Sequence, residues 1–539
     1  MPTPRERHPR RRNSETSTMT TMTRRQALTT LSYTAAIPWV ASCGRNTPPS
    51  GETGSAESVS VLVDEPLHYL SLTKVAQQIE NRSISPVELT ESMLRRIAAV
   101  DDQLKSYATV MSDQAMAAAH VAEAEIQRGH YRGPLHGIPI AVKDLCFTQG
   151  VRTMGATAVL ADFVPTYDAT VVARLREAGA VLLGKLNLTE GAMAAYHPDF
   201  EIPVNPWDAS IWPGASSSGS GVATAAGLCF GSLGSDTGGS IRFPSAHCGV
   251  VGLKPTWGRV SRYGVLELAG SLDHIGPMTR TVADAAIMLE TIAGADPNDP
   301  TSLQTPVPSI IDTLDGNIAG LRLGFDRQYA LTGVDQDVVN AVEEALSILE
   351  ELGAEIVDVQ VPDAPEDWVT ICSFEAARAH SETYPSRADE YGPYFREFLK
   401  NGLAVTAGEY DEANTRRLAF VERFEEMLST VDALVCPSTV TTLPITSGMR
   451  YESIAAFGEA LASIAKALDP PLDSIQLGRF TQPADFAGTP TISVPCGFSD
   501  DGAPQSLQFV GRDLSEVTIC RLAHAYEQAT EWHTRHPEV

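Results

Sequence analysis

The sequence is poor in basic residues and lacks the paired cysteines that bind zinc. Its 539 residues include 40 lysines and arginines against 67 aspartates and glutamates, which gives a formal net charge of −27. A surface with this excess of negative charge repels phosphate backbones, so we expect no nucleic-acid binding. The eight cysteines form no C-x-x-C pair, and several stand in apolar runs such as "AGLCFGSLG". This pattern is typical of buried, unreactive thiols.

Several catalytic motifs are missing as well. The sequence contains no G-x-S-x-G, the nucleophile turn of α/β-hydrolases, and no H-E-x-x-H zinc motif. The stretch "GAVLLGKL" has the glycine–lysine spacing of a phosphate-binding loop, but Leu186 stands where a magnesium-binding hydroxyl is needed. The stretch also passes from helix to strand, the reverse of the required order. We therefore expect no cofactor and no metal.

Basic residues are concentrated at the N-terminus. The segment "TRRQALTTLSYTAAIPWVASC" joins a twin arginine, Arg24 and Arg25, to a moderately apolar run that ends at Cys43. This run is too short and polar to span a membrane, and it is typical of a twin-arginine export signal over residues 1–42. "VASC" resembles the lipobox of bacterial lipoproteins, so Cys43 is either a lipid anchor or a passenger in a cleaved signal. We predict an exported protein, periplasmic or extracellular.

A flexible tether is predicted over residues 43–66, which are rich in glycine, serine, threonine, proline and glutamate. The folded part begins near residue 67 with Val75 and Ile79 at helical spacing. Ser85 then precedes a proline, as at a helix N-terminus, and a second helix is predicted to about residue 100.

Short apolar runs alternate with helical patterns over the rest of the chain. Strands are predicted for "GIPIAVKD", "AVLLGKLN", "AEIVDVQVP", "VDALVCPSTV" and "TPTISVPCGF". The alternation predicts an α/β fold, a mixed central sheet covered by helices on both faces. The span from about 295 to 475 is more helical and more acidic, and we expect it to form a lobe over the core rather than a separate domain.

Three segments could carry chemistry. Lys143 ends the strand "PIAVK", where burial would favour its neutral form. The run "NPWDASIWPGASSSGSG" is dense in small residues, which suits a tight pocket wall or a flexible loop. Taken alone, "GSDTGGSIRFP" (residues 234–244) predicts a turn. Its backbone N–H groups at Gly238, Gly239 and Ser240 would nevertheless converge, an arrangement that binds an oxyanion.

A serine nucleophile needs a base to take its proton. His197 and His247 are the histidines nearest to these segments, and we interpret both as packing or surface residues. A neutral lysine can replace histidine as the base. Where lysine and nucleophile do not touch, a second serine hydroxyl can relay the proton, because it both donates and accepts.

Together these segments resemble the amidase signature family. The resemblance rests on "GIPIAVKD", "NPWD…PGASSSGSG", "GSLGSDTGGSIRFPSAHCGVVGLKPTWGRVSRYGV", "LDHIGPMTRTVADAA" and "AGTPTISVPCGF", spread over residues 68–535. In that family a lysine, a serine after a cis peptide bond and a nucleophilic serine form the catalytic set, which matches Lys143, Ser216 and Ser240. The resemblance also implies an oxyanion hole built from the backbone N–H groups of Thr237, Gly238, Gly239 and Ser240.

The resemblance assigns supporting roles too. Asp236 and Arg242 would fix the nucleophile loop, Ser217 is a second candidate for the relay, and Ser235 is interpreted as structural. The chain departs from the usual "PGGSSGGS" because Ala215 precedes the expected cis bond and Ser218 replaces a glycine. Asp485 stands where related sequences often carry asparagine.

The implied activity is hydrolysis of a small-molecule carboxylic amide, through a serine acyl-enzyme, to an acid and ammonia or an amine. The amidase domain is predicted over residues 67–536, with a homodimer expected from the resemblance. Two alternatives stay open. One is the glutamine-hydrolysing subunit of a tRNA-dependent amidotransferase; the other is a catalytically inactive, surface-binding lipoprotein.

Overall fold

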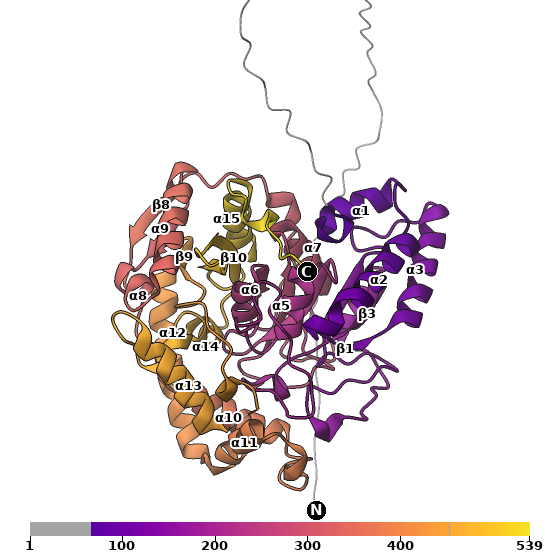
Figure 1. Cartoon of the computed structure of the whole chain (residues 1–539). Coiled ribbons are helices and arrows are strands. Elements are labelled where there is room, and N and C mark those ends of the chain that lie inside the picture. Colours follow the sequence, from indigo (N-terminus) through magenta and orange to yellow (C-terminus); the bar gives the residue numbers. More distant parts are fainter. Residues whose placement is uncertain (1–65, 452) are drawn as a thin grey trace, which may run out of the picture. The chain divides into compact units, whose positions relative to one another are not determined.

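An eleven-stranded sheet organises the part of the chain that the computed structural model describes, residues 66–451 and 453–539 (Figure 1). Of residue 475 only the backbone is described. The strand order is β1-β3-β2-β4-β6-β5-β10-β11-β9-β7-β8. The strands are β1 (Tyr107–Val110), β2 (Pro139–Lys143), β3 (Val181–Leu186), β4 (Gly231–Asp236), β5 (Val251–Lys254), β6 (His274–Thr279), β7 (Arg322–Phe325), β8 (Glu355–Asp358), β9 (Ala433–Pro437), β10 (Thr491–Phe498) and β11 (Pro504–Val510).

The sheet is mixed, as predicted. Strand β2 runs parallel to β3 and β4, and β7 runs parallel to β8 and β9. The remaining pairs are antiparallel. Each of the five strands predicted from apolar runs is present: they are β2, β3, β8, β9 and β10.

Helices cover both faces of this sheet. Every residue of β2 to β6, β9 and β11 is buried, so neither face of these strands meets water. The predicted α/β fold is therefore confirmed. The α-helices of the described residues are α1 (Leu72–Glu80), α2 (Pro86–Leu104), α3 (Ser112–Gln127), α4 (Thr170–Glu177), α5 (Ser218–Ala225), α6 (Arg242–Cys248), α7 (Val282–Ile292), α8 (Arg327–Leu331), α9 (Gln336–Glu351), α10 (Trp368–Ala379), α11 (Pro393–Ala404), α12 (Ala407–Leu428), α13 (Ile454–Ala467), α14 (Gln482–Ala487) and α15 (Glu516–Gln528).

Helix α2 begins where the sequence predicts. The Ser85 hydroxyl accepts the backbone N–H of Glu88 at 3.0 Å, and the Glu88 carboxylate accepts the N–H of Ser85 at 3.3 Å, a reciprocal capping box. The helix runs to Leu104, four residues beyond the predicted end. Its last turn, "DDQL", is mostly polar and gives little apolar signal, yet Leu104 is buried there; Lys105, at φ 54°, then ends the helix.

The span 295–475 contributes to the same sheet rather than only covering it. It supplies β7, β8 and β9, and β9 pairs with β11 along the register Leu507–Pro437 to Val510–Leu434. Its helices α10 to α13 lie together below β9 in the view of Figure 1, in orange. Residues 64–539 form one compact unit.

All seven cysteines of the described residues are free and buried, as the apolar runs predict. Burial raises the pKa of Cys146 and of Cys436 to about 12, so both thiols stay protonated at neutral pH. No helix within residues 66–451 and 453–539 is long and apolar enough to cross a membrane. The predicted export signal, Cys43 and the tether up to residue 65 lie outside the described residues.

Candidate active site

Strand order brings the lysine and the nucleophile segment to one edge of the sheet. Lys143 is the last residue of β2 and Asp236 the last residue of β4, and these strands are parallel neighbours. Parallel neighbours end at the same edge, where ligands bind in open α/β sheets. The chain then runs through residues 237–241, called here the nucleophile loop, into α6. The serine run 216–218 enters α5 beside it, and the backbone N–H of Ser217 donates to the carbonyl of Ser240 at 3.3 Å.

The Lys143 amine is fully buried among three serine hydroxyls. Its Nζ lies 2.7 Å from Ser216 Oγ, 2.9 Å from Ser217 Oγ and 2.8 Å from Ser235 Oγ. Burial lowers the pKa of Lys143 to about 7, even though the negative charges of Asp236 and other neighbours oppose this shift. A substantial share of this lysine is therefore neutral at physiological pH and can accept a proton.

The bond that each hydroxyl proton makes decides which serine can pass a proton to Lys143. Ser217 Oγ donates to the carbonyl of Ser235 at 3.2 Å and accepts the backbone N–H of Ser235 at 3.2 Å. Its single proton is thus committed, and its bond to Lys143 is one that the lysine donates. Ser216 and Ser235 are left to face the lone pair of a neutral lysine. The peptide bond between Ala215 and Ser216 is cis, as the resemblance predicts.

Ser235 contacts the lysine, which the sequence did not predict. We interpreted it as structural, but its hydroxyl contacts the Lys143 amine. The sequence holds no motif for this contact. It arises because β4 lies beside β2 with Val142 opposite Leu233, which places Ser235 near the end of β2.

The nucleophile loop departs from the predicted oxyanion hole at one position. The N–H of Gly239 donates to Asp236 Oδ1 at 2.5 Å, so this group is already engaged. The N–H groups of Thr237, Gly238 and Ser240 are left as candidates for binding an oxyanion. Ser240 itself is half-buried, whereas Lys143 and Ser216 are wholly enclosed, so the predicted nucleophile is the member of the set that reaches solvent.

Asp236 and Arg242 fix the loop from inside, as the resemblance predicts. The Asp236 carboxylate accepts the N–H of Ile241 at 3.0 Å, besides that of Gly239, and binds Arg242 Nε and Nη2 at 3.0 Å each. Burial alone would raise the pKa of Asp236, but the charge and hydrogen bonds of Arg242 outweigh it and hold this pKa well below its usual range. The carboxylate stays ionised and anchors the loop.

Arg242 also binds a second carboxyl group. Its Nη2 lies 2.7 Å from Asp485 Oδ2, on α14, and 3.0 Å from Asp236 Oδ1. Burial, and after it the charge of Asp236, raises the pKa of Asp485 well above its usual range, against the opposing charges of Arg242 and Lys254. Asp485 Oδ1 is buried and makes no hydrogen bond within the described residues. One guanidinium thus binds two carboxyl groups, and the ionised Asp236 favours the protonated form of Asp485.

Three residues remote in sequence bind the loop through hydrogen bonds. The Trp368 indole N–H donates to the carbonyl of Thr237 at 2.9 Å, and the Thr481 hydroxyl donates to the carbonyl of Gly238 at 2.7 Å. The Thr237 hydroxyl donates to Asp273 Oδ1 at 2.6 Å. Sequence reasoning missed all three, because each lies 36 or more residues from its partner and belongs to no contiguous motif.

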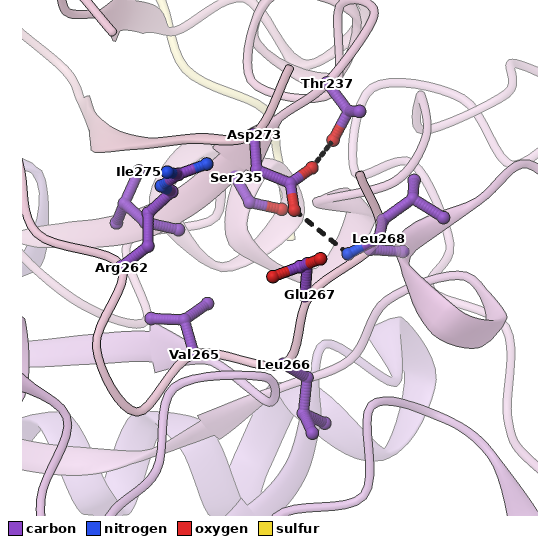
Figure 2. A pocket seen from close by; sticks show the side chains of 10 residues that line it. Ser235, Thr237, Arg262, Val265, Leu266, Glu267, Leu268, Asp273 and Ile275 are labelled. Atoms are coloured by element: carbon purple, nitrogen blue, oxygen red, sulfur yellow. Dashed lines mark hydrogen bonds between the residues drawn. The ribbon is translucent and has the colours of Figure 1, made fainter. Parts of the chain in front are cut away.

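Behind the loop lies a small cavity of about 30 Å³, large enough for a water molecule (Figure 2). Ser235 and Thr237 form part of its lining, together with the carboxyls of Glu267 and Asp273. Burial raises the pKa of Asp273 to about 6, although the Thr237 hydroxyl and two backbone N–H groups stabilise the carboxylate. Of the three serine hydroxyls that contact Lys143, only that of Ser235 belongs to a residue lining this cavity, whose wall combines acidic and apolar side chains.

The structure also shows the surroundings of two histidines and one lysine to which sequence reasoning assigned no catalytic role. His247 Nδ1 bonds the carbonyl of Phe243 at 2.8 Å and His197 Nδ1 accepts the N–H of Asp199 at 3.0 Å, so both histidines pack as predicted. Lys185 in "GAVLLGKL" is a buried strand residue bound to Asp144 at 3.0 Å. Within residues 66–451 and 453–539, no group of three or more histidine, cysteine or acidic side chains could hold a metal ion.

The comparison with known families decides the identity. The model of the family described as Amidase matches residues 88–520, most of the chain. The chain belongs to the amidase family. Like other amidases it is a hydrolase that acts on the C–N bonds of small-molecule amides.

Several known proteins resemble it along nearly their whole length. AmiD of Mycobacterium tuberculosis is 46% identical over 481 residues, covering 89% of this chain and 98% of that protein. A glutamyl-tRNA(Gln) amidotransferase subunit of Geobacter metallireducens is 40% identical, covering 87% and 99%. Among solved structures, the peptide amidase of Stenotrophomonas maltophilia superposes with a TM-score of 0.75 at 30% identity, covering 88% and 99%.

Proposed function

We propose that this amidase works through Ser240 as nucleophile, Ser216 as proton relay and Lys143 as base. The observation that carries the proposal is the 2.7 Å contact between the Lys143 amine and Ser216 Oγ, with a lysine pKa of about 7. The bond from the N–H of Ser217 to the carbonyl of Ser240 links the relay segment to the nucleophile segment. A neutral, buried amine is the group a serine hydrolase without a catalytic histidine needs.

Acylation starts from neutral Lys143. Ser240 Oγ attacks the amide carbonyl and passes its proton to Ser216, while Ser216 passes its own proton to Lys143. The carbonyl oxygen becomes an oxyanion that the loop N–H groups of Thr237, Gly238 and Ser240 stabilise. Lys143 returns the proton through Ser216 to the amide nitrogen, the C–N bond breaks, and ammonia or an amine leaves the acyl-enzyme.

Deacylation repeats the sequence with water. Water attacks the ester carbonyl, and its proton travels through Ser216 to Lys143. When the second tetrahedral intermediate collapses, the proton returns to Ser240 Oγ and the carboxylic acid is released. Protons and electrons balance within the set over one turnover, so this route calls for no cofactor.

The test is covalent labelling and turnover of serine and lysine variants. A fluorophosphonate probe should label the wild type on Ser240 and leave Ser240→Ala unlabelled and inactive. Lys143→Ala should form the acyl-enzyme only at high pH. Ser217→Ala is the matched control, because the Ser217 proton is committed to Ser235: it should keep much more activity than Ser216→Ala. Full activity of Ser240→Ala would contradict the proposal.

A glutamine-hydrolysing amidotransferase component is the second candidate, because a relative described as a glutamyl-tRNA(Gln) amidotransferase subunit matches most of the chain. The greater similarity to AmiD and the predicted export signal favour a free-standing amidase. Co-purification of a tRNA-binding partner, with glutamine as the preferred substrate, would reverse this preference. Labelling of Ser240 would in turn dismiss an inactive binding lipoprotein.

We also propose that the protein is exported through Arg24 and Arg25, anchored by a lipid on Cys43, and dimeric. The N-terminal sequence supports the first two points, and the family resemblance supports the third. Radiolabelled palmitate should enter the wild type and not Cys43→Ala. Arg24→Lys with Arg25→Lys should keep the protein in the cytoplasm, and light scattering should give twice the chain mass. A soluble, unlabelled monomer in the cytoplasm would contradict these points.

A further inference from the structure

Two aromatic side chains flank the residues just before the nucleophile. Trp368 opens α10 and Phe243 lies in the first turn of α6, far apart in sequence. Both side chains are half-buried, as is Ser240. Each of the three therefore keeps some solvent-exposed surface, unlike the enclosed Lys143 and Ser216.

The glycines of the loop show how closely the rings approach. A Cβ atom at Gly238 would lie 2.7 Å from the Trp368 ring, and one at Gly239 would lie 2.6 Å from the Phe243 ring. Only a residue without a side chain fits against either ring. The Trp368 N–H also donates to the carbonyl of Thr237, which fixes the indole in place. The rings are thus rigid walls on the two residues preceding Ser240.

Three charged residues near these rings are buried or paired. Asp236 and Arg242 are fully buried and bound to each other. Asp367, next to Trp368, is held by Arg416 through two contacts of 2.8 Å. A charged substrate group placed on the rings would lose hydration while these three residues are already engaged, whereas a flat apolar group would lose little.

We propose that Trp368 and Phe243 make this enzyme select amides that carry an aromatic ring close to the scissile carbonyl. The proposal rests on Ser240 as nucleophile, because the rings matter to selectivity only beside the reacting atom. Aromatic rings gain from offset or edge-to-face stacking beyond the area they bury. A saturated ring of similar size gains only from the area it buries. Comparing the two rings therefore isolates the contribution of aromatic stacking.

The experiment compares phenylpropionamide with cyclohexylpropionamide, which release the same ammonia from equally reactive carbonyls. The wild type should give a higher kcat/KM for the phenyl amide. Trp368→Leu should lower the phenyl-to-cyclohexyl ratio roughly three- to ten-fold. Trp368→Phe keeps a ring but loses the N–H to Thr237, so it should lower kcat for both amides and largely preserve the ratio. Phe243→Leu is an independent second variant.

Trp207→Leu is the matched control. Its indole N–H also donates to a backbone carbonyl, that of Cys248 at 2.8 Å, but it does not touch the nucleophile loop. Its ratio should equal that of the wild type. An unchanged ratio in Trp368→Leu and Phe243→Leu, or a wild type that prefers the cyclohexyl amide, overturns the proposal. Failure of Ser240 as nucleophile would look different: Ser240→Ala would still release ammonia and would still be labelled by the fluorophosphonate probe.

Discussion

At the scale of single residues, the protonation of Lys143 should set the pH dependence of catalysis. Burial brings the pKa of this lysine from 10.5 to about 7. Only the neutral amine has a lone pair for the relay, so activity requires the deprotonated form. We expect kcat/KM for an uncharged amide to fall below a pH of about 7 as one proton is taken up. A profile that stays flat from about pH 6 to about pH 9 would contradict the role of Lys143 as base.

The Asp485 carboxyl should behave as a neutral group. Because its pKa is raised well above the usual range, it keeps a proton where an exposed aspartate is ionised, and it then resembles the asparagine often found there in related sequences. Asp485→Asn should therefore keep activity within about two-fold, since a neutral acceptor for Arg242 Nη2 remains. Asp485→Leu removes this acceptor and should lose much more activity.

The sign of the stability effect follows from the same pKa. A carboxyl with a raised folded-state pKa favours folding most below its unfolded pKa, and this contribution is lost progressively as pH rises toward the folded pKa. Wild-type Tm should thus fall between about pH 5 and about pH 8 more than the Tm of Asp485→Asn. Thermal unfolding of both proteins at the two pH values checks this. Parallel Tm changes would show that Asp485 is ionised.

A side chain at Gly238 should damage catalysis. In Gly238→Ala the new Cβ would stand 2.7 Å from the Trp368 ring, so the loop or the ring must shift. A displacement of about 1 Å near the reacting atoms can cost about a hundred-fold in rate, and we expect a loss of this order in kcat/KM. Gly458→Ala is the control, because nothing lies within 4 Å of its added Cβ. Equal activity of the two variants would contradict the tight fit.

At the scale of elements, helix caps should contribute to stability without affecting chemistry. Ser85→Ala removes the side-chain acceptor at the start of α2 and should cost about 1 kcal/mol. Denaturant or thermal unfolding should show this loss, while kcat/KM stays at the wild-type value because α2 begins far from Ser240 in the chain. A loss of activity in folded Ser85→Ala would reveal a coupling that the contacts do not show.

Element order explains why the active-site edge forms. Strand β2 brings Lys143, β4 brings Ser235 and Asp236, and their parallel pairing puts these chain ends at one edge. Helix α10, within the span 295–475, supplies Trp368. Thr481 lies after this span and immediately precedes α14. This half of the chain both extends the sheet and holds the nucleophile loop from outside.

At the scale of the whole molecule, catalysis should need only the compact unit of residues 64–539. Every residue of the proposed site lies in this unit. A chain that starts at residue 64 should therefore show the wild-type kcat/KM on a soluble amide. The Tm of this chain should also match that of the full protein. A several-fold drop in activity would mean that the first 63 residues act on the site.

The sequence by itself determined the fold class, the strands β2, β3, β8, β9 and β10, and the start of α2. Its contiguous motifs, through their resemblance to the amidase signature family, also indicated Lys143, Ser216 and Ser240 as the residues to examine. The structure then places the first two in hydrogen-bond contact. Local pattern suffices for such features because strand periodicity, capping and small-residue loops depend on neighbours along the chain.

Only the tertiary structure decided how the loop is held. The contact of Ser235 with Lys143 depends on the register of two parallel strands. The hydrogen bonds of Trp368 and Thr481 to the loop depend on packing between segments more than a hundred residues apart. The capture of the Gly239 N–H by Asp236 depends on the backbone angle of a tight turn. None of these contacts follows a periodic or contiguous sequence pattern, so only the tertiary structure reveals them.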